Sequence, residues 1–265
     1  MPVLARAALH HWEEPPISGT RGSGTIFFSG CSLDCVFCQN EKISHQDFGK
    51  SVTLDRLRAI CQTLIDQGAH NLNFVNPTHY AHTLAALLED WRPPIPVVFN
   101  TGGYDRTETL RGLEGKIDIY LPDLKYLDGA VARRCSGAPD YPEVAQAAIW
   151  EMVRQTGPCR FDDNGLLLRG TIIRHLILPG QLNQAREVMD WVARAFPPGT
   201  VLFSLMSQYT PWGDLSALPE LNRRLRPGEI RSAREYMENL GLDGFTQERT
   251  SAKEEYTPPF DLTGI

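Results

Sequence analysis

Residues 25–40 read TIFFSGCSLDCVFCQN, and this stretch carries the strongest structural signal in the chain. Residues 25–29 are β-branched or aromatic up to a final serine, which predicts a buried strand. Gly30 then lets the backbone turn sharply. The three cysteines that follow, Cys31, Cys35 and Cys38, have the spacing C-x3-C-x2-C. The sequence therefore predicts three thiols on a short loop at the carboxyl end of a strand, where α/β folds carry their chemistry.

Three thiolates on one short loop can hold three irons of a 4Fe-4S cluster, since such clusters are bound by cysteine sulfur. A fourth iron without a cysteine would be open to a substrate, as the open position of a catalytic zinc site is. Two alternatives remain, a zinc site completed by a nearby residue such as His45, and buried reduced cysteines with no metal. Zinc sites favour C-x2-C pairs that recur at a distance, and the sequence has no second pair. The spacing therefore favours the cluster.

The motif resembles that of the radical S-adenosylmethionine (SAM) superfamily, because C-x3-C-x2-C follows a strand and Phe37 precedes the last cysteine. Residues 30–40 are similar to the pyruvate formate-lyase activating enzyme and its less characterised homologues, and the resemblance extends from residues 13–16 to residues 259–261. It implies two cofactors, a 4Fe-4S cluster and SAM, whose amino and carboxylate groups would bind the open iron. Reduction would cleave SAM to methionine and a 5'-deoxyadenosyl radical that abstracts hydrogen from a substrate. The resemblance also implies an electron donor such as flavodoxin or ferredoxin, and a protein glycine as one candidate substrate.

Length and composition place the chain among ordinary globular proteins. Its 265 residues allow one large domain, and 42% hydrophobic with 22% charged residues is normal usage. A net charge of -6 argues against a nucleic-acid partner, and no apolar run is long enough to span a bilayer. The N-terminus lacks the apolar stretch of a signal peptide, and Cys61, Cys135 and Cys159 lack disulfide spacing. We therefore expect a cytoplasmic monomer with no membrane partner.

Six strands are predicted, at residues 25–29, 71–75, 96–99, 117–121, 171–178 and 201–206. Helical periodicity is predicted at residues 54–65, from residues 76–79 to Leu88, at about 142–155, around Val188 to Phe196, and near 229–240. The alternation indicates a parallel α/β sheet with right-handed crossovers, and the resemblance narrows this to a partial (β/α)6, TIM-like barrel. We expect a single domain over residues 1–265, with an irregular leader at 1–23, a barrel core at 24–247 and a C-terminal tail at 248–265.

Polar residues gather where the predicted strands end. Carboxyl ends of parallel strands share one rim, so these residues should converge. The resemblance assigns them to SAM: Asn76 or Thr78 to its amino group, where relatives carry an acid, and others to its methionyl carboxylate. The alternatives are a helix N-cap at residues 76–78 and a surface position for Lys125. The candidate cofactor-binding residues are Phe37, Asn76, Thr78, Asn100, Thr101, Asp123, Lys125, Arg174, Leu176, Ser207 and Gln208.

Arg174 lies in an otherwise apolar predicted strand, on the same face as Leu176 and Leu178. If that face points inward, the buried guanidinium requires an anionic partner. The resemblance implies a carboxylate or ribose hydroxyl of SAM as that partner, with Leu176 against the adenine. The alternative is pairing with a structural acid of the chain.

Two functions from different classes are consistent with these residues. One is a radical SAM enzyme with catalytic and metal-binding Cys31, Cys35 and Cys38, acting as a glycyl-radical-activating oxidoreductase. The other is a non-catalytic metal-binding protein whose cysteine loop is structural or senses redox state. Glu13 and Glu14 could approach the rim, but the sequence does not place them.

Overall fold

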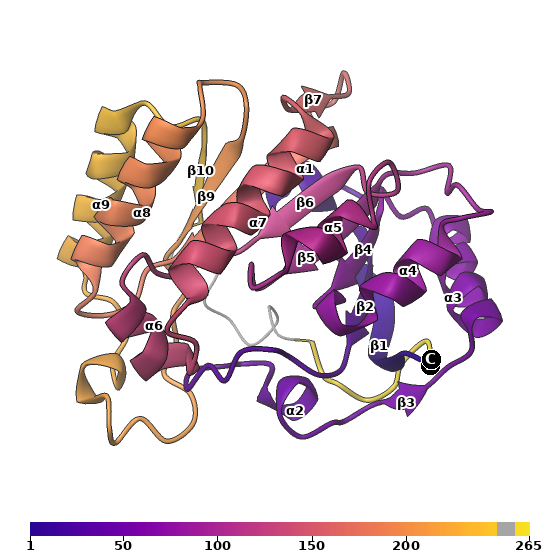
Figure 1. Cartoon of the computed structure of the whole chain (residues 1–265), viewed down its shortest axis with the longest axis horizontal. Helices are drawn as coiled ribbons and strands as arrows, with labels where there is room; N and C mark the ends of the chain where they lie inside the picture. The colour runs from indigo at the N-terminus through magenta and orange to yellow at the C-terminus, as the bar shows by residue number, and fades with distance from the viewer. Residues whose placement is uncertain (248–257) are drawn as a thin grey trace.

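One mixed sheet organises the computed structural model, which describes residues 1–247 and 258–265 (Figure 1). Within these residues the strand order is β10-β9-β8-β6-β5-β4-β2-β1-β3, with β7 (Arg160–Phe161) paired to β8. The strands from β2 to β10 along this path run parallel, and β1 (Val3–His10) and β3 (Lys50–Ser51) add to the edge antiparallel. The parallel strands are β2 (Ser23–Phe28), β4 (Leu72–Val75), β5 (Val97–Thr101), β6 (Ile119–Pro122), β8 (Leu167–Leu176), β9 (Leu202–Met206) and β10 (Gly244–Gln247).

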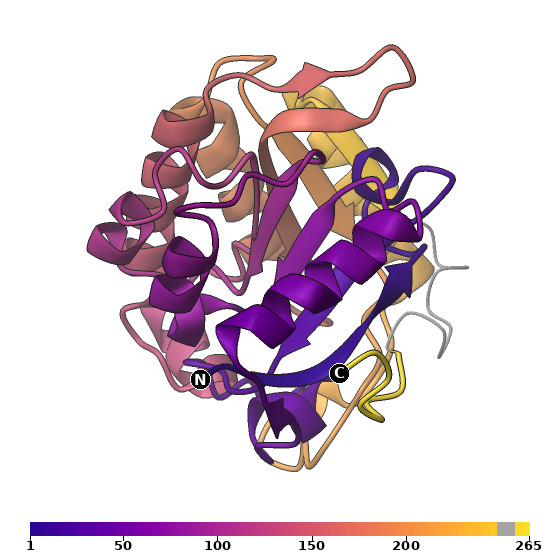
Figure 2. The same cartoon turned by 90° about the vertical axis from the view of Figure 1, so that its right-hand side faces the viewer.

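Helices cover the outer face of this curved sheet, so the inner face is left for the site (Figures 1 and 2). The longer helices are α3 (Leu54–Asp66), α4 (Ala81–Leu87), α6 (Gly129–Ser136), α7 (Tyr141–Thr156), α8 (Leu182–Ala195) and α9 (Pro227–Leu240). Short helices are α1 (Pro15–Ser18), α2 (Glu41–Ser44) and α5 (Thr107–Arg111), with 3-10 turns at Thr78–Tyr80 and Pro219–Leu221. In the part of the chain that the structure describes, no helix combines the length and apolar character that a bilayer crossing requires.

Helix α3 illustrates how the sequence forms these elements. The Thr53 side chain caps it by accepting a hydrogen bond from the Arg56 backbone N–H, which contributes about 1 kcal/mol. Leu57, Ile60 and Leu64 recur at helical spacing and are buried against the sheet.

All six predicted strands are present, and their parallel arrangement is confirmed. The prediction of an irregular leader at residues 1–23 was wrong, because β1 (Val3–His10) pairs antiparallel with β2. The prolines and glycines of the leader lie outside this strand, whereas Leu4 and Ala5 within it are fully buried. Strand β10 was not predicted, since four residues carry no clear period.

The predicted C-terminal tail, residues 248–265, falls partly outside the described residues. Its end at residues 258–265 runs along the edge strand β1, where Ala7 donates a backbone hydrogen bond to Thr263 and Leu262 donates one to Ala5 (Figure 2). Phe260 is buried against Phe27. The boundaries proposed at residues 23/24 and 247/248 stay a prediction.

The amino end of the barrel interior is closed by the segment that follows β1. Ile17 of α1 is fully buried against inward-facing side chains of the parallel strands, among them Val98, Leu121 and Ile172. Side chains two residues apart on a strand share a face, so the next inward positions carry polar groups. Those positions are Asn100, Asp123 and Arg174. An apolar floor thus supports a polar layer, and the candidate site lies on that layer.

Candidate functional site

The cysteine loop, residues 29–40, leaves the carboxyl end of β2 as predicted. Gly30 has φ +92°, a left-handed conformation that favours glycine, and its carbonyl accepts a hydrogen bond from the Asn76 side chain. The other side of the loop is held by α6, because Asp34 and Val36 donate backbone hydrogen bonds to the carbonyls of Ser136 and Cys135. The loop is therefore fixed on one side by the Asn76 side chain and on the other by the backbone of α6, two contacts that the sequence did not predict.

The three thiols lie close enough that the charges of Cys38 and Cys31 raise the pKa of Cys35. Burial is the larger cause and raises that pKa to about 12, against the lowering effect of Lys125. Burial also raises the pKa of Cys38. Cys35 and Cys38 line the cavity described below, and the Cys31 sulfur accepts a hydrogen bond from the Leu33 backbone N–H at 3.4 Å. Such buried thiols become thiolates only when a metal or cation stabilises them.

The zinc alternative required a residue such as His45 beside the cysteines. Its Nε2 lies 3.3 Å from the Leu33 carbonyl oxygen and 3.2 Å from an Asp34 carboxylate oxygen, and its Nδ1 contacts the Ser44 hydroxyl. Over residues 1–247 and 258–265, no three His, Cys, Asp or Glu side chains are grouped as ligands for one metal ion. A 4Fe-4S cluster binds each thiolate through a different iron, so its ligands surround a cage rather than one point.

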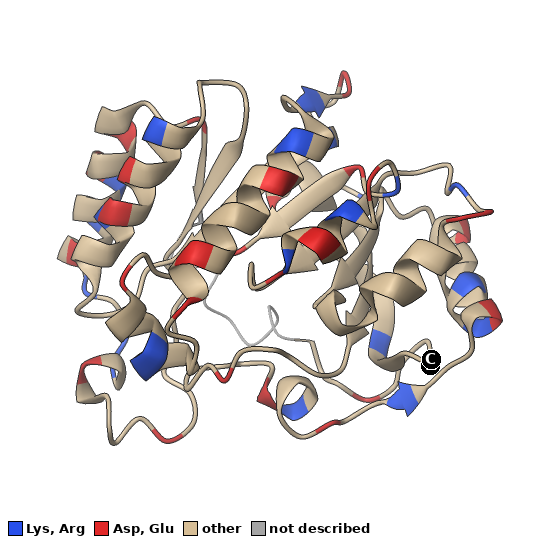
Figure 3. Ribbon diagram, viewed as in Figure 1, with Lys and Arg blue, Asp and Glu red and all other residues tan. Residues whose placement is uncertain are grey.

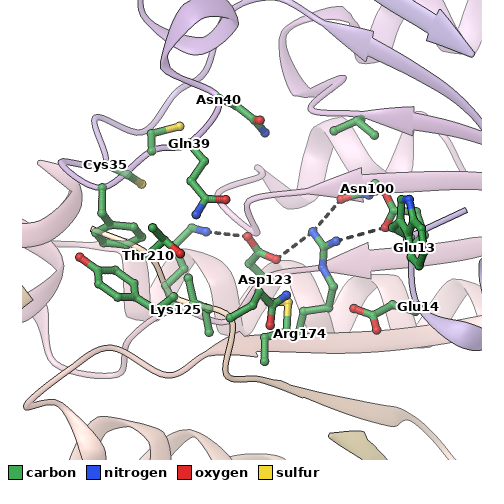
Figure 4. A pocket seen from close by; sticks show the side chains of 18 of the residues that line it. Glu13, Glu14, Cys35, Gln39, Asn40, Asn100, Asp123, Lys125, Arg174 and Thr210 are labelled. Atoms are coloured by element: carbon green, nitrogen blue, oxygen red, sulfur yellow. Dashed lines mark hydrogen bonds and ion pairs between the residues drawn. The ribbon is translucent and has the colours of Figure 1, made fainter. Parts of the chain in front are cut away.

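Four charged side chains cross the barrel interior as an ion-pair chain, Lys125–Asp123–Arg174–Glu13 (Figure 4). Lys125 Nζ lies 2.5 Å from one oxygen of Asp123, and Arg174 Nη2 lies 2.9 Å from the other. Arg174 also donates to the Asn100 side-chain oxygen at 2.7 Å and lies 3.7 Å from Glu13. The chain runs from Cys35 at one side of the cavity to Glu13 at the other.

The charges of this chain stabilise one another although they are buried. Burial opposes the ionisation of Asp123, but the positive charges of Arg174 and Lys125 outweigh it and lower the pKa of that carboxyl. For Lys125, burial acts to lower the pKa, and the negative charge of Asp123 is the largest of the effects that raise it above its ordinary value. Asp123, Lys125 and Arg174 are therefore all charged at neutral pH.

Glu13 and Glu14 complete the interior from the segment between β1 and α1. Glu14 is buried, and one carboxylate oxygen accepts a hydrogen bond from the Ser204 hydroxyl of β9 at 3.0 Å. Glu13 accepts a hydrogen bond from the Asn100 amide at 3.3 Å. The sequence could not place these two residues, because an antiparallel edge strand carries them to the barrel interior.

A cavity of about 300 Å³ lies over the ion-pair chain and reaches the cysteine loop. Its walls include most of the residues predicted from strand ends, which the fold does bring together. The predicted residues that line it are Cys35, Phe37, Cys38, Asn100, Asp123, Lys125, Arg174, Leu176 and Gln208. Lys125 is part-buried on this wall rather than on the outer surface. The partner that Arg174 requires is supplied by the chain itself, so the structural-acid alternative describes the arrangement observed here.

Other predicted residues lie behind the cavity wall rather than in it. Thr78 and Thr101 donate hydrogen bonds to the buried Asp105 at 2.8 and 2.7 Å, and Asn76 donates to Gly30. The helix-cap alternative is wrong for Asn76 and Thr78, because neither side chain caps the turn at Thr78–Tyr80. Ser207, which was predicted to contact SAM, is buried and does not line the cavity. Cys31 belongs to the same loop as the other two cysteines but does not line the cavity either. Asp105 was missed, since no motif in the sequence marks it.

Comparison with known proteins gives a match to the cysteine-loop region and a match to the fold. Residues 18–122, which include the cysteine loop, match the family model described as a 4Fe-4S single cluster domain. The fold is similar to that of Streptococcus suis SuiB bound to S-adenosylmethionine, with TM-score 0.57 and 16% identity over 85% of this chain and 50% of SuiB. This similarity to SuiB shows the fold of the chain, and the match over residues 18–122 shows where a 4Fe-4S domain is recognised in it. A partial TIM-like barrel, open at one side, is therefore confirmed as its fold class.

Two further similarities extend over most of this chain. A radical SAM methyltransferase from Sphaerobacter thermophilus has TM-score 0.52 and 12% identity, over 84% of this chain and 66% of that one. "Uncharacterized protein MJ0674" of Methanocaldococcus jannaschii is 31% identical over 233 residues. That alignment includes 83% of this chain, which spans 63% of the relative's length.

Proposed function

We propose that the chain is an enzyme that reductively cleaves SAM on a 4Fe-4S cluster and uses the resulting radical to take hydrogen from a substrate. One observation carries the proposal: two thiols of the C-x3-C-x2-C loop and the ion-pair chain line the same cavity. A structural or redox-sensing cysteine loop has no need of such a cavity. When bound, the two cofactors supply the electron and the 5'-deoxyadenosyl radical.

The residues of the loop fit a cluster with three protein ligands. Cys31, Cys35 and Cys38 would each bind one iron through sulfur, and all six cysteines of the chain are free of disulfide bonds. The pKa of Cys35 is raised to about 12, so this thiol gives up its proton only when a cation replaces it. Iron would be that cation.

The cavity residues fit a zwitterionic ligand that also carries a positive sulfonium. Lys125 and Arg174 would attract its carboxylate, while Asp123 would balance the positive charges. Lys125 is the better candidate for binding the carboxylate, because the Arg174 guanidinium already contacts three side chains, those of Asp123, Asn100 and Glu13. Phe37 and Leu176 offer apolar walls for a nucleoside, and Gln208 an amide.

Asn76, Thr78, Thr101 and Ser207 keep a supporting role in this proposal. The hydrogen bonds of Thr78 and Thr101 to Asp105 fix the loops that follow β4 and β5. Asn76 ties the first of these loops to Gly30 at the start of the cysteine loop. These residues would hold the cavity in shape, so their replacement should alter SAM binding only indirectly.

The finer parts of the proposal concern substrate and partners. SuiB has been solved bound to its precursor peptide SuiA, with TM-score 0.55 and 16% identity to this chain. By analogy we include a protein substrate, with a glycine of a glycyl-radical enzyme as one candidate. A flavodoxin or ferredoxin would deliver the electron, in the cytoplasm, where thiols stay reduced.

Anaerobic reconstitution with iron and sulfide tests the proposed function. Reduced protein incubated with SAM should release 5'-deoxyadenosine, and the Cys35→Ser variant should lose this activity. Cys159→Ser is the matched control, because the Cys159 thiol contacts the Thr171 and Thr200 carbonyls away from the loop. Tight zinc binding without SAM cleavage would refute the proposal.

A further inference from the structure

The Cys35 sulfur lies 3.0 Å from the hydroxyl oxygen of Ser136, which in turn lies 3.0 Å from the hydroxyl oxygen of Tyr126. Ser136 and Tyr126 are each 1% exposed, so water does not compete for these contacts. Sequence separation is large, since Ser136 is 101 residues from Cys35. The fold therefore brings a dry chain of two hydroxyl groups to one thiol of the cysteine loop.

The backbone holds this arrangement in place. Asp34 donates its N–H to the Ser136 carbonyl at 3.1 Å, and Val36 donates its N–H to the Cys135 carbonyl at 3.0 Å. The two donors lie immediately before and after Cys35 in the sequence, and Ser136 is one of the two acceptors. Helix α6 ends at once, because Gly137 has φ +68° and closes the last turn. These backbone hydrogen bonds fix the position of the Cys35 backbone relative to that of Ser136, so the two side chains start from neighbouring points.

The direction of the hydrogen bonds follows once Cys35 is a thiolate. A thiolate has no proton to give, so the Ser136 hydroxyl must be the donor. Bonds to a charged acceptor are the stronger ones, and Ser136 therefore directs its single proton to sulfur rather than to Tyr126. The Ser136 oxygen is then free to accept the Tyr126 proton, which polarises the bond to sulfur.

We propose that Ser136 donates a hydrogen bond to the Cys35 thiolate and thereby raises the reduction potential of the cluster that Cys35 helps to hold. The inference rests on the proposed function and deepens it. Hydrogen bonds to ligand sulfurs are one of the protein's means of setting cluster potentials. Withdrawing charge from sulfur makes the cluster easier to reduce, so Ser136 is a positioning residue that acts through Cys35.

Cys38 has a weaker counterpart in Ser44, which offers an internal comparison. Its hydroxyl oxygen lies 3.3 Å from the Cys38 sulfur. The same hydroxyl donates to the Asn40 carbonyl at 3.0 Å and lies 3.1 Å from His45 Nδ1. Its single proton has other acceptors, so Ser44 should affect the potential less than Ser136 does.

The test is a redox titration of the reconstituted full-length protein, followed by electron paramagnetic resonance of the reduced cluster. Ser136→Ala should shift the midpoint potential to a more negative value, with iron content unchanged. Tyr126→Phe removes one hydroxyl without changing the ring and should give a smaller shift in the same direction. Ser44→Ala should shift it least. Ser232→Ala is the control, because that hydroxyl accepts a hydrogen bond from Arg186 between α8 and α9, away from the cysteine loop.

Unchanged potentials in Ser136→Ala and Tyr126→Phe, at full iron content, would overturn the inference and leave the proposed function intact. If the Ser136→Ala variant does not bind a cluster, the midpoint potential of Tyr126→Phe alone tests the inference. An unchanged potential in that variant would overturn it. A wild-type protein that takes up no iron-sulfur cluster would overturn the proposed function itself and this inference with it.

Discussion

The ammonium nitrogen of Lys125 lies 2.5 Å from a carboxylate oxygen of Asp123, two residues earlier at the end of β6. Both side chains are mostly buried, and the same Asp123 carboxylate pairs with Arg174 of β8. Burial raises the pKa of Cys35, and the positive charge of Lys125 acts against that rise. Lys125 is thus the end of the ion-pair chain on the side of the cysteine loop, which is why we assign it to the SAM carboxylate.

Lys125→Met should weaken SAM binding while leaving the cluster in place. An ion-paired hydrogen bond to a charged group is worth about 1.5–3 kcal/mol, so affinity should fall about tenfold to hundredfold. Equilibrium titration of the cluster-loaded protein with SAM measures the change. Lys50→Met on the exposed strand β3 is the control. A loss of iron in Lys125→Met, instead of a loss of SAM, would show that the assignment is wrong.

Arg174→Met should destabilise the fold more than Lys125→Met does. Arg174 has three partners in the barrel interior, and its removal leaves Asp123 and Glu13 without their common cation. Breaking a buried ion pair from one side costs about 3–5 kcal/mol. Urea unfolding measures the loss.

The double variant Arg174→Met with Asp123→Asn is the companion to this experiment. It removes both charges of one pair, so the two losses should be less than additive. Strict additivity of the two single variants would contradict the ion-pair chain.

Acid stability should depend on His175, a buried residue of β8 whose Nδ1 lies 2.7 Å from the Leu124 carbonyl oxygen. Burial lowers its pKa to about 4, although the Leu124 bond and Asp123 act to raise it. The unfolded chain takes up a proton near pH 6.5 and the folded one only near pH 4, so stability falls as the pH drops through this window. The full effect is about 3 kcal/mol.

His175→Asn retains a donor for Leu124 and removes the titration. Its free energy of unfolding, measured between pH 4 and 7, should fall less steeply with acid than that of the wild type. An identical slope in both proteins would assign the acid sensitivity to other groups.

Ile17→Ala should open the floor beneath the polar layer. Ile17 is fully buried against Val98, Leu121 and Ile172, and truncation of such a side chain costs about 2–5 kcal/mol. Leu54→Ala is a matched control, because Leu54 is 39% exposed and should cost far less. Thermal unfolding compares the two. Equal losses would mean that the segment around α1 does not support the barrel.

The sequence predicted the elements that repeat a simple period. Six strands, the helix capped by Thr53 and the cysteine loop after Gly30 were recognisable because each combines a hydrophobic pattern with a turn or cap residue. Residues at strand ends could be grouped before the structure, since parallel strands share a rim. That logic grouped Asn100, Asp123 and Lys125, which line one cavity, and the alternation of the strand at 171–178 added Arg174 to them.

What the sequence could not show depends on contacts without a local pattern. Glu13 reaches the barrel interior because β1 runs antiparallel, and Ser136 reaches Cys35 because α6 ends against the cysteine loop. Thr78 and Thr101 were expected in the cavity, but the buried Asp105 takes their hydroxyls. A polar residue at a strand end is therefore a candidate for the site, and its neighbours decide whether it faces the ligand.

The central claim is that Cys31, Cys35 and Cys38 bind a cluster whose fourth iron is open to SAM. Electron paramagnetic resonance of the reduced, reconstituted protein with and without SAM tests this most directly. We predict that SAM changes the spectrum of the wild-type cluster, and that Lys125→Met needs a higher SAM concentration for the same change. A spectrum that SAM leaves unaltered in the wild type, at full iron content, would contradict the claim.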